Sequence, residues 1–598
     1  MLDPRLYRAG LIPLLLAVVV VAFSLAERPR PQRTTLAADA FDADRAYGEL
    51  RELVRRHPER RPGSRGDRAL ADEMAGAFAE AGFRVRSTVE DGVTIDGSQP
   101  LRNVIAHRPG TSDERVVVVA HRDAARRGSP AELSATAALL ELARVYGAPR
   151  RTKRTLTLVS TSGGSGGNAG AARLASELPE GMEVSAVLVL GDLASRELTR
   201  KPVVVPWSNG GEGLAPLQLR RTVQAAVEAE SGREVPGPRA LVQGARLALP
   251  FTPGAQGVVA PDGLPAVMLS ARGDQLPPAG APVSRARLDE FGRAALRSVT
   301  VLDNGPSQAA PATTDLVTAR KVLPGWTVTL LSGALLLPVV LTVVDGFARA
   351  RRRREAVGAG MRWTLAGAVP FAVVVLLTWL LNLIGLLPPA PGAPVDPRAL
   401  PLGGGQAVAL AVVALAFVLA WLTARPLAVR AFVGRRHDPR SPGAAAGLLV
   451  VLTLVAVVVW ALNPFAALLL VPALHAWLLA VTPDIRLPRW AGLALLALGV
   501  IPVLVLGLYV ARGLDAGPLD LAWQAVVWVA GGHLGLLGAL LGTVLAGCGV
   551  AVASIVVRPH HERPAQDALR PERVTSVRGP LTYAGPGSLG GTESALRR

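Results

Sequence analysis

Apolar residues are distributed along this chain in two different ways. Residues 40–305 alternate short apolar runs with amphipathic stretches, whereas from about Leu323 onward the apolar stretches approach the roughly 20 residues that a helix needs to cross a bilayer. A further apolar run, from Leu11 to Ala26, follows Arg5 and Arg8. The pattern predicts a water-soluble domain between one N-terminal span and a multi-pass helical bundle.

The soluble region combines the patterns of buried strands and amphipathic helices. Val- and Leu-rich runs bounded by such helices are typical of a sheet buried on both faces. We therefore predict an α/β domain, specifically a three-layer α/β/α sandwich, joined to an all-α transmembrane helix bundle. The predicted strands cover 84–89, 104–107, 116–120, 155–161, 186–190, 203–206 and 266–270, and the predicted helices cover 44–56, 68–81, 135–146, 170–178, 216–231 and 284–302.

The C-terminal half predicts about seven membrane helices. Residues 522–532 carry Trp523 and Trp528, which suit an interfacial or re-entrant segment around 519–532. The N-terminal run fits an uncleaved anchor, and a cleaved signal peptide is the alternative. The predicted spans lie near 323–345, 363–387, 405–424, 443–462, 465–482, 490–511 and 530–557.

Arginine residues are concentrated in alternate loops between these spans. By the positive-inside rule these loops and the C-terminal tail are cytoplasmic, so both termini are inside and residues 40–305 are outside the plasma membrane. The other loops hold Arg398 and Arg512 only. The arginines of the first set are Arg349, Arg351 to Arg354, Arg425, Arg430, Arg435, Arg436, Arg440, Arg486, Arg489, Arg558, Arg563, Arg570 and Arg573.

These patterns divide the chain into six parts. They are an anchor (1–27), a linker (28–39), an extracytoplasmic domain (40–305), a second linker (306–322), a membrane domain (323–558) and a Pro-, Gly- and Arg-rich tail (559–598) that we expect to be disordered.

Composition narrows the function classes. Half of the residues are hydrophobic and the mean hydropathy is +0.35, which favours a membrane protein whose first partner is the lipid bilayer. The formal net charge of +18 does not indicate nucleic-acid binding, because much of it flanks apolar runs. A single cysteine, Cys548, excludes a disulfide framework and a Cys-rich zinc site. The Ala-, Gly-, Pro- and Arg-rich composition is typical of a GC-rich, bacterial genome.

Four ordered segments of the soluble region resemble metallopeptidase family 28, the zinc aminopeptidases related to aminopeptidase Y and glutamate carboxypeptidase. They are Asn103–His107, the Val117–Asp123 strand ending in His-Arg-Asp, Ala137–Arg144, and the Gly-Leu-Pro-Ala-Val-Met-Leu run at Gly263–Leu269. The resemblance covers roughly residues 40–305. It implies the zinc-aminopeptidase fold and peptide hydrolysis by two zinc ions with a glutamate as general base.

Three residues match the metal site that this resemblance implies. His121 matches the first histidine ligand, Asp123 matches the carboxylate that orients it, and Asp192 matches the second aspartate ligand. Each also has a structural interpretation: His121 with Asp123 as a hydrogen-bonded pair at a strand end, and Asp192 as a cap of a turn.

The remaining positions of the implied site carry other residues. Ala131 stands at the bridging aspartate, with Glu132 beside it, and Gln256 stands at the last histidine. Gly163 and Gly164 stand where the family has its general base and its glutamate ligand. Two remaining ligands fall short of the three or four that a zinc site needs.

The sequence thus favours a dismantled peptidase site with no cofactor. We expect a non-catalytic membrane protein whose external cleft binds a peptide, an envelope precursor or a partner protein. The first alternative is an active zinc peptidase with relocated ligands from His121, Asp123, Asp192 and Glu132.

The second alternative is a transporter, suggested by histidines in the apolar stretches. His475 and His533 are candidates because intramembrane ionisable groups often carry function. A histidine can also hydrogen-bond between helices and serve packing alone, which we favour here.

Overall fold

A computed structural model describes residues 3–557 of the chain except 148–150, 179–182, 199–202, 212, 309, 390, 435–437, 483–484 and 486. Within it, residues 1–556 pack as one compact unit. The predicted tail at 559–598 and the loop residues Arg435, Arg436, Arg486 and Arg558 lie outside the described residues.

The soluble region is built on a mixed seven-stranded sheet with strand order β2-β3-β5-β4-β6-β8-β7. Strands β5, β4, β6 and β8 are parallel to one another, while β2, β3 and β7 pair antiparallel at the two sides. All seven predicted strands are confirmed. They run over β2 (Arg84–Thr94), β3 (Gly97–Arg108), β4 (Glu114–His121), β5 (Thr155–Thr161), β6 (Glu183–Leu190), β7 (Val204–Val205) and β8 (Ala266–Leu269).

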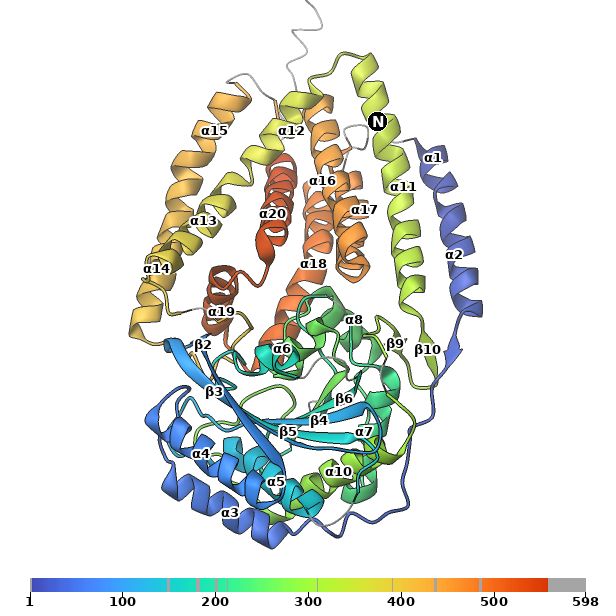
Figure 1. Cartoon of the computed structure of the whole chain (residues 1–598). Coiled ribbons are helices and arrows are strands. Elements are labelled where there is room, and N and C mark those ends of the chain that lie inside the picture. The colour runs from blue at the N-terminus through green and yellow to red at the C-terminus, as the bar shows by residue number, and fades with distance from the viewer. Residues whose placement is uncertain are drawn as a thin grey trace, which may run out of the picture. The chain divides into compact units, whose positions relative to one another are not determined.

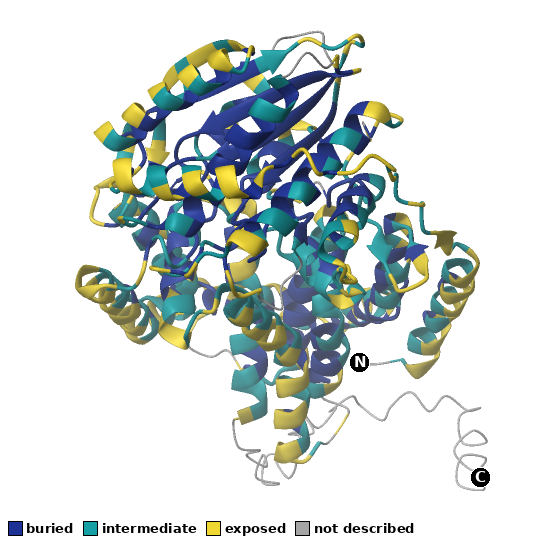
Figure 2. Ribbon diagram, turned by 90° about the horizontal axis from the view of Figure 1, so that it is seen from below, coloured by how far each residue is buried: buried dark blue, intermediate teal, exposed yellow. Residues whose placement is uncertain are grey.

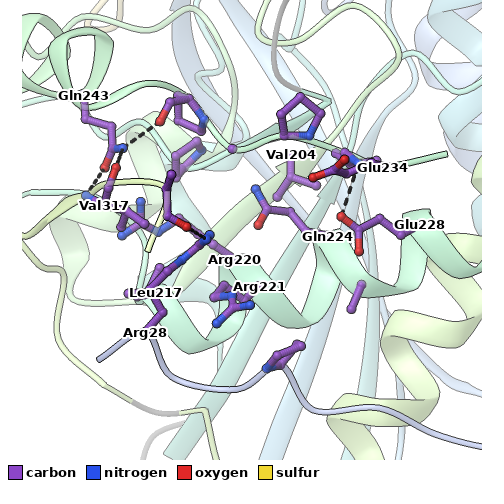
Figure 3. A pocket seen from close by; sticks show the side chains of 18 of the residues that line it. Arg28, Val204, Leu217, Arg220, Arg221, Gln224, Glu228, Glu234, Gln243 and Val317 are labelled. Atoms are coloured by element: carbon purple, nitrogen blue, oxygen red, sulfur yellow. Dashed lines mark hydrogen bonds between the residues drawn. The ribbon is translucent and has the colours of Figure 1, made fainter. Parts of the chain in front are cut away.

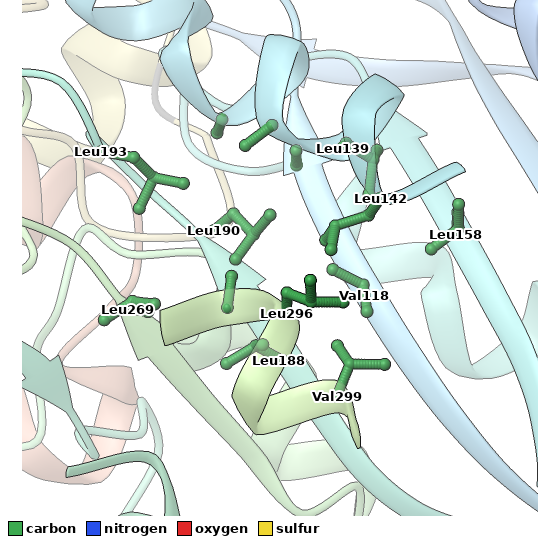
Figure 4. Close-up of a cluster of buried hydrophobic side chains, with 14 of the residues drawn as sticks. Val118, Leu139, Leu142, Leu158, Leu188, Leu190, Leu193, Leu269, Leu296 and Val299 are labelled. Carbon is green, nitrogen blue, oxygen red and sulfur yellow. The ribbon is translucent and has the colours of Figure 1, made fainter. Parts of the chain in front are cut away.

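One face of the sheet is covered by long amphipathic helices (Figure 1). Figure 4 shows how Val118 and Leu188 of the sheet meet Leu139 and Val299 of the helices, and all four are at most 1 % exposed. The helices are α3 (Ala43–Arg56), α4 (Arg65–Glu80), α5 (Pro130–Gly147), α7 (Leu217–Ser231) and α10 (Arg285–Asn304).

Helix α3 illustrates why these segments are helical. The side chain of Asp42 accepts a hydrogen bond from the backbone N–H of Arg45, which caps the first turn. Ala46, Leu50 and Leu53 follow at helical spacing and are completely buried. Their burial against the sheet side of the domain stabilises a helix that would be marginal alone.

The other face of the sheet carries shorter elements and borders the membrane helices. Its hydrophobic cluster includes Val328 and Phe465, which come from the predicted membrane domain. The elements are α6 (Leu174–Glu177), α8 (Ala240–Ala248) and α9 (Gln256–Val259). The helix predicted over 170–178 is present as two adjoining short pieces, a 3-10 helix (Ala171–Arg173) and the single turn α6.

Seven helices of the described part are long and apolar enough to cross a membrane, or eight if the α12–α13 pair, bent by 41°, is one span. This matches the predicted apolar stretches. The helices are α1 with α2 (Pro4–Ala9, Leu11–Phe23), α11 (Gly325–Arg352), α12 (Val357–Ala366), α13 (Val369–Leu383), α14 with its continuation α15 (Gly404–Leu419, Arg425–Phe432), α16 (Pro442–Leu462), α17 (Pro464–Val481), α18 (Arg489–Leu514) and α20 (Gly535–Val557).

Burial separates the two regions (Figure 2). The central strands are buried, whereas membrane helices carry exposed apolar side chains, such as Val503 and Leu504 of α18, which are 54 % and 64 % exposed. Such surfaces suit contact with lipid. The chain is therefore compatible with a multi-pass membrane protein.

The segment around 519–532 is helix α19 (Pro518–Ala530), whose 13 residues are fewer than a span requires. The last span begins later than predicted, at Gly535, so His533 lies in the turn between α19 and α20 and not within a span. Glycines at 531, 532 and 535, the latter two with positive φ, end one helix and delay the next.

A small second sheet lies where the chain enters and leaves the soluble domain. Strand β1 (Ala26–Glu27), just after α2, pairs with β10 (Lys321–Leu323), which pairs with β9 (Leu316–Val317). The two predicted linkers are thus held together next to α2 and α11.

Candidate functional site

The matched metal-site positions gather at one edge of the sheet. His121 is the last residue of β4, Gly163 and Gly164 follow β5, and Asp192 follows β6. Because β5, β4 and β6 are parallel, their carboxyl ends share this edge, which is where ligand sites form in α/β sheets.

The loop after β5 packs directly against His121. A Cβ atom added to Gly164 would lie 2.3 Å from Cβ and 2.4 Å from Cγ of His121, so only glycine fits without displacement. His121 Nε2 is buried and has no hydrogen-bond partner among the described residues. Burial lowers the pKa of His121, against the attraction of Asp123, so the ring is neutral near pH 7.

The carboxylate of Asp123 is engaged by the same loop. Its Oδ1 accepts from the backbone N–H of Gly164 at 2.8 Å, and its Oδ2 accepts from the backbone N–H and the hydroxyl of Ser165 at 2.9 and 2.5 Å. These bonds hold the loop after β5 against the residues that follow β4, and they direct the carboxylate toward the backbone of that loop.

Asp192 caps the turn after β6. Its Oδ1 accepts from the backbone N–H groups of Ala194 and Ser195 at 3.0 and 2.9 Å, and its Oδ2 accepts from the Ser195 hydroxyl. Burial raises the pKa of Asp192, and the Ser195 hydroxyl opposes that shift. The capping interpretation of Asp192 thus accounts for the contacts seen here.

The position of the bridging aspartate lies in the first turn of α5. Ala131 is completely buried, and the neighbouring Glu132 is 2 % exposed. Burial raises the pKa of Glu132 to about 7, against a hydrogen bond from Ser129 and the charge of Arg60. Glu132 is thus a buried carboxyl beside the position of the bridging aspartate.

Gln256, at the last-histidine position, begins a polar chain that reaches a membrane helix. Its Nε2 donates to the Thr252 hydroxyl at 3.3 Å, and that hydroxyl donates to Asp274 at 2.9 Å. Arg246 pairs with Asp274 at 3.1 Å and donates to the hydroxyl of Tyr509 on α18 at 3.2 Å.

The loop between α13 and α14 lies against the same edge. A Cβ on Gly167, in the loop after β5, would meet Pro391 Cβ at 2.2 Å. Asp396 accepts from the backbone N–H of Leu276, beyond β8, at 3.0 Å. Val395 and Leu400 belong to one hydrophobic cluster with Ala125, which follows β4. The bundle thus contacts loops from three parallel strands.

A cavity of about 630 Å³ lies between the loop after β5 and the loop between α13 and α14, and none of the matched metal-site positions lines it. Asn209 and Phe251 line it from the domain, Gly392 from the α13–α14 loop, and His533 from the turn before α20. Asn209 Nδ2 and His533 Nε2 are buried without a hydrogen-bond partner in the described chain. The cavity therefore offers unpaired polar groups to a ligand.

His475 lies inside the bundle and is satisfied there. Its Nδ1 lies 2.6 Å from the hydroxyl of Tyr7 in α1, and its Nε2 lies 3.0 Å from the carbonyl oxygen of Leu335 in α11. These bonds join three helices, which supports the packing interpretation.

The pair of zinc ions implied by the family resemblance does not fit these residues. No group of three or more His, Cys, Asp or Glu that could hold a metal ion occurs in the described part of the chain. Asp123 and Asp192 use both oxygens in local hydrogen bonds, and Gly164 packs on His121. The donor set is too small for a zinc centre.

The fold and this edge define a peptidase-like α/β domain combined with helices that are long and apolar enough to cross a membrane. The sequence profile of peptidase family M28 matches residues 103–218, which contain β4, β5, β6 and the edge described above. The resemblance to family 28 is thereby confirmed over these residues.

Solved structures similar to part of the chain include a glutaminyl cyclase and two aminopeptidases. The glutaminyl cyclase, of Porphyromonas gingivalis, is 19 % identical over 44 % of this chain and 99 % of that one, with a TM-score of 0.35. A leucine aminopeptidase precursor of Bacteroides thetaiotaomicron is 16 % identical over 47 % of this chain and 100 % of that one, with a TM-score of 0.34. A zinc aminopeptidase of Bacillus subtilis is 11 % identical over 45 % of this chain and 98 % of that one, with a TM-score of 0.35. No curated protein sequence matches the chain.

Two features of the site have no signal in the sequence pattern. Arg246 and Asp274 read as ordinary surface charges, yet they connect the cleft to α18. The contact of Pro391 with Gly167 joins segments more than 200 positions apart, and no local sequence pattern predicts it.

Proposed function

We propose that this protein is a non-catalytic, membrane-embedded relative of the family 28 peptidases. Its external domain would bind a peptide, an envelope precursor or a partner protein at the former catalytic edge. The bundle would hold the domain at the outer surface of the plasma membrane, with both chain termini in the cytoplasm.

The observation that carries this proposal is the packing of Gly164 on His121. In the family, this position supplies a carboxylate to the metal site, and here backbone fills the adjoining space. The cavity of about 630 Å³, with unpaired Asn209 and His533 atoms, supports retention of a binding role. Its volume is within the range typical of ligand pockets, roughly 300–1,000 Å³.

A second function, zinc-dependent hydrolysis with relocated ligands, is favoured by one observation. Glu132 is buried, and this burial raises its pKa to about 7, which suits a general base. It would have to act with His121, Asp123 and Asp192, whose present contacts would first have to rearrange.

Zinc content of the full chain in a neutral detergent separates the two functions. After mild dialysis and elemental analysis, we expect less than about a tenth of an equivalent of zinc and no cleavage of aminoacyl reporter substrates, because catalytic sites hold metal near stoichiometry. His107→Ala, on β3, is the matched control for His121→Ala. One or two equivalents of zinc that disappear in His121→Ala alone would contradict the proposal.

A further inference from the structure

A second cavity, of about 680 Å³, lies away from the catalytic edge (Figure 3). It is formed by α7, the segment 234–240 before and into α8, and residues of the two linkers, including Arg28 and Ala319. It shares no lining residue with the cavity at the former catalytic edge. We call it the arginine cavity.

The lining of the arginine cavity is strongly basic. Five arginines and two glutamates line it, so their formal charges leave an excess of three positive charges. Figure 3 draws Arg28, Arg220 and Arg221 on one side of the cavity, with Glu228 and Glu234 on the other. The arginines are Arg28, Arg33, Arg220, Arg221 and Arg239.

Arg220 is buried in this wall, and two of its three side-chain nitrogens have no hydrogen-bond partner in the described chain. The side chain is 4 % exposed, and these two nitrogens are Nε and Nη2. Burial lowers the pKa of Arg220 to about 10 against the attraction of Asp315, so the guanidinium is still charged at neutral pH. Asp315 itself accepts from the backbone N–H of Gly325 at 2.9 Å. A buried charge without an ion-pair partner in contact is costly, so an anion in the cavity would stabilise this guanidinium.

The neighbouring arginines add charge and do not neutralise it. Arg221 donates to the carbonyl oxygen of Pro29, and Arg28 donates to that of Ala319 at 2.7 Å, so both partners are neutral. Burial lowers the pKa of Arg221, and the charges of Arg28 and Arg33 lower it further, against the attraction of Glu228. Like charges held this close are stable when an anion lies between them.

The position of the cavity relates it to the membrane. Arg28 directly follows β1, which itself lies just after the membrane helix α2. Ala319 lies between β9 and β10, shortly before α11. The pairing of β1 with β10 holds both segments at the place where the chain leaves and re-enters the predicted spans.

We propose that the arginine cavity binds a phosphate-bearing anion beside the membrane surface, with the guanidinium groups of Arg220, Arg221 and Arg28 facing the phosphate. Arginine suits this role because its planar fork donates two parallel hydrogen bonds to phosphate oxygens. The phosphate can belong to the headgroup of an anionic phospholipid or to a water-soluble compound, and both present the same chemistry.

Ligand-dependent melting of the full chain tests the proposal. One arm adds inorganic phosphate to protein in neutral detergent, against potassium chloride of equal ionic strength. The other compares nanodiscs of phosphatidylcholine with nanodiscs containing about 30 % phosphatidylglycerol. We expect at least one probe to raise the melting midpoint of the wild type, because a ligand of the folded state stabilises it by mass action. A shift with phosphate identifies a soluble ligand, and a shift with phosphatidylglycerol alone identifies a headgroup.

The variant Arg220→Met separates binding from folding. Without probe it should melt at the wild-type temperature or above, because it removes a buried charge without an ion-pair partner in contact, and its apparent affinity for the effective probe should fall at least tenfold. Arg233→Met, at an exposed position just beyond α7, is the matched control and should behave as wild type. Arg28→Gln repeats the test at a half-buried position.

Two results would overturn the proposal. In one, neither phosphate nor phosphatidylglycerol shifts the wild-type midpoint. In the other, Arg220→Met and Arg28→Gln respond to the probe as strongly as the wild type does.

Discussion

The Glu132 carboxyl should make the stability of the peptidase-like domain depend on pH. The side chain is 2 % exposed, and burial raises its pKa from 4.5 to about 7, against a hydrogen bond from Ser129 and the charge of Arg60. Between these two values the folded protein keeps a proton that the unfolded chain has released. Stability should therefore fall as the pH rises from about 4.5 to about 7 and stay level above.

The size of the effect follows from the two pKa values. A difference of one unit between the pKa values in the folded and unfolded states changes the free energy of unfolding by about 1.4 kcal/mol. The full penalty for ionising Glu132 in the folded state is then about 3 kcal/mol. In a domain of this size, a change of 1 kcal/mol in stability shifts the melting midpoint by about 2 °C. The melting midpoint at pH 8 should therefore lie roughly 6 °C below the midpoint at pH 4 as far as Glu132 is concerned.

The substitution Glu132→Gln removes the titrating group and keeps its shape. We expect the variant to match the wild type near pH 4 and to melt at a higher temperature at pH 8. The measurement is the melting midpoint of the full chain in detergent between pH 4 and pH 8.5. Glu80→Gln, at the exposed end of α4, is the control and should leave the pH profile unchanged.

The opposite outcome would refute this reasoning. If Glu132→Gln were less stable than wild type at pH 8, the native carboxylate would be ionised and held by a positive partner. That result would favour the zinc site with relocated ligands, because a bound cation lowers the pKa of its carboxylate ligands.

Two further predictions concern packing. Gly164→Ala should lower the free energy of unfolding by about 1–3 kcal/mol, because the added methyl group overpacks against His121, and it should speed amide exchange in β4 and β5. The control Gly48→Ala, whose added Cβ has no atom within 4 Å, should leave exchange unchanged. Equal exchange rates in the two variants would contradict the packing of Gly164 on His121. Tyr7→Phe should lower the melting midpoint of the full chain, because it removes the 2.6 Å hydrogen bond to His475. A hydrogen bond of this kind between helices in a bilayer contributes about 1 kcal/mol to stability. An unchanged midpoint would argue against a retained N-terminal helix in contact with α17.

Much of the fold was predictable because its signals are local. The strand β5 was predicted with its observed ends, Thr155 and Thr161, since a run of apolar and β-branched residues is read directly from the chain. Helix α5 begins five residues earlier than predicted, at Pro130, because proline suits the first helical turn and the buried Ala131 continues the apolar face. His533 was misplaced because glycines broke the apolar run.

The candidate site was predictable only in part. The replacements at Ala131, Gly164 and Gln256 are visible in the order of the family motifs. The hydrogen bonds that engage Asp123 depend on the path of the loop after β5, and no local pattern encodes that path.

By itself, the sequence determined the long apolar helices, the strand and helix order, and the residue type at each position that the family resemblance singles out. These follow from apolar length, periodicity and motif order, which are properties of neighbouring residues. Only the tertiary structure decided that Pro391 meets Gly167, that Arg246 reaches Tyr509, and that two nitrogens of the buried Arg220 have no hydrogen-bond partner in the described chain. The physical reason is that burial and charge pairing depend on which distant segments pack together, and that is settled by the whole fold.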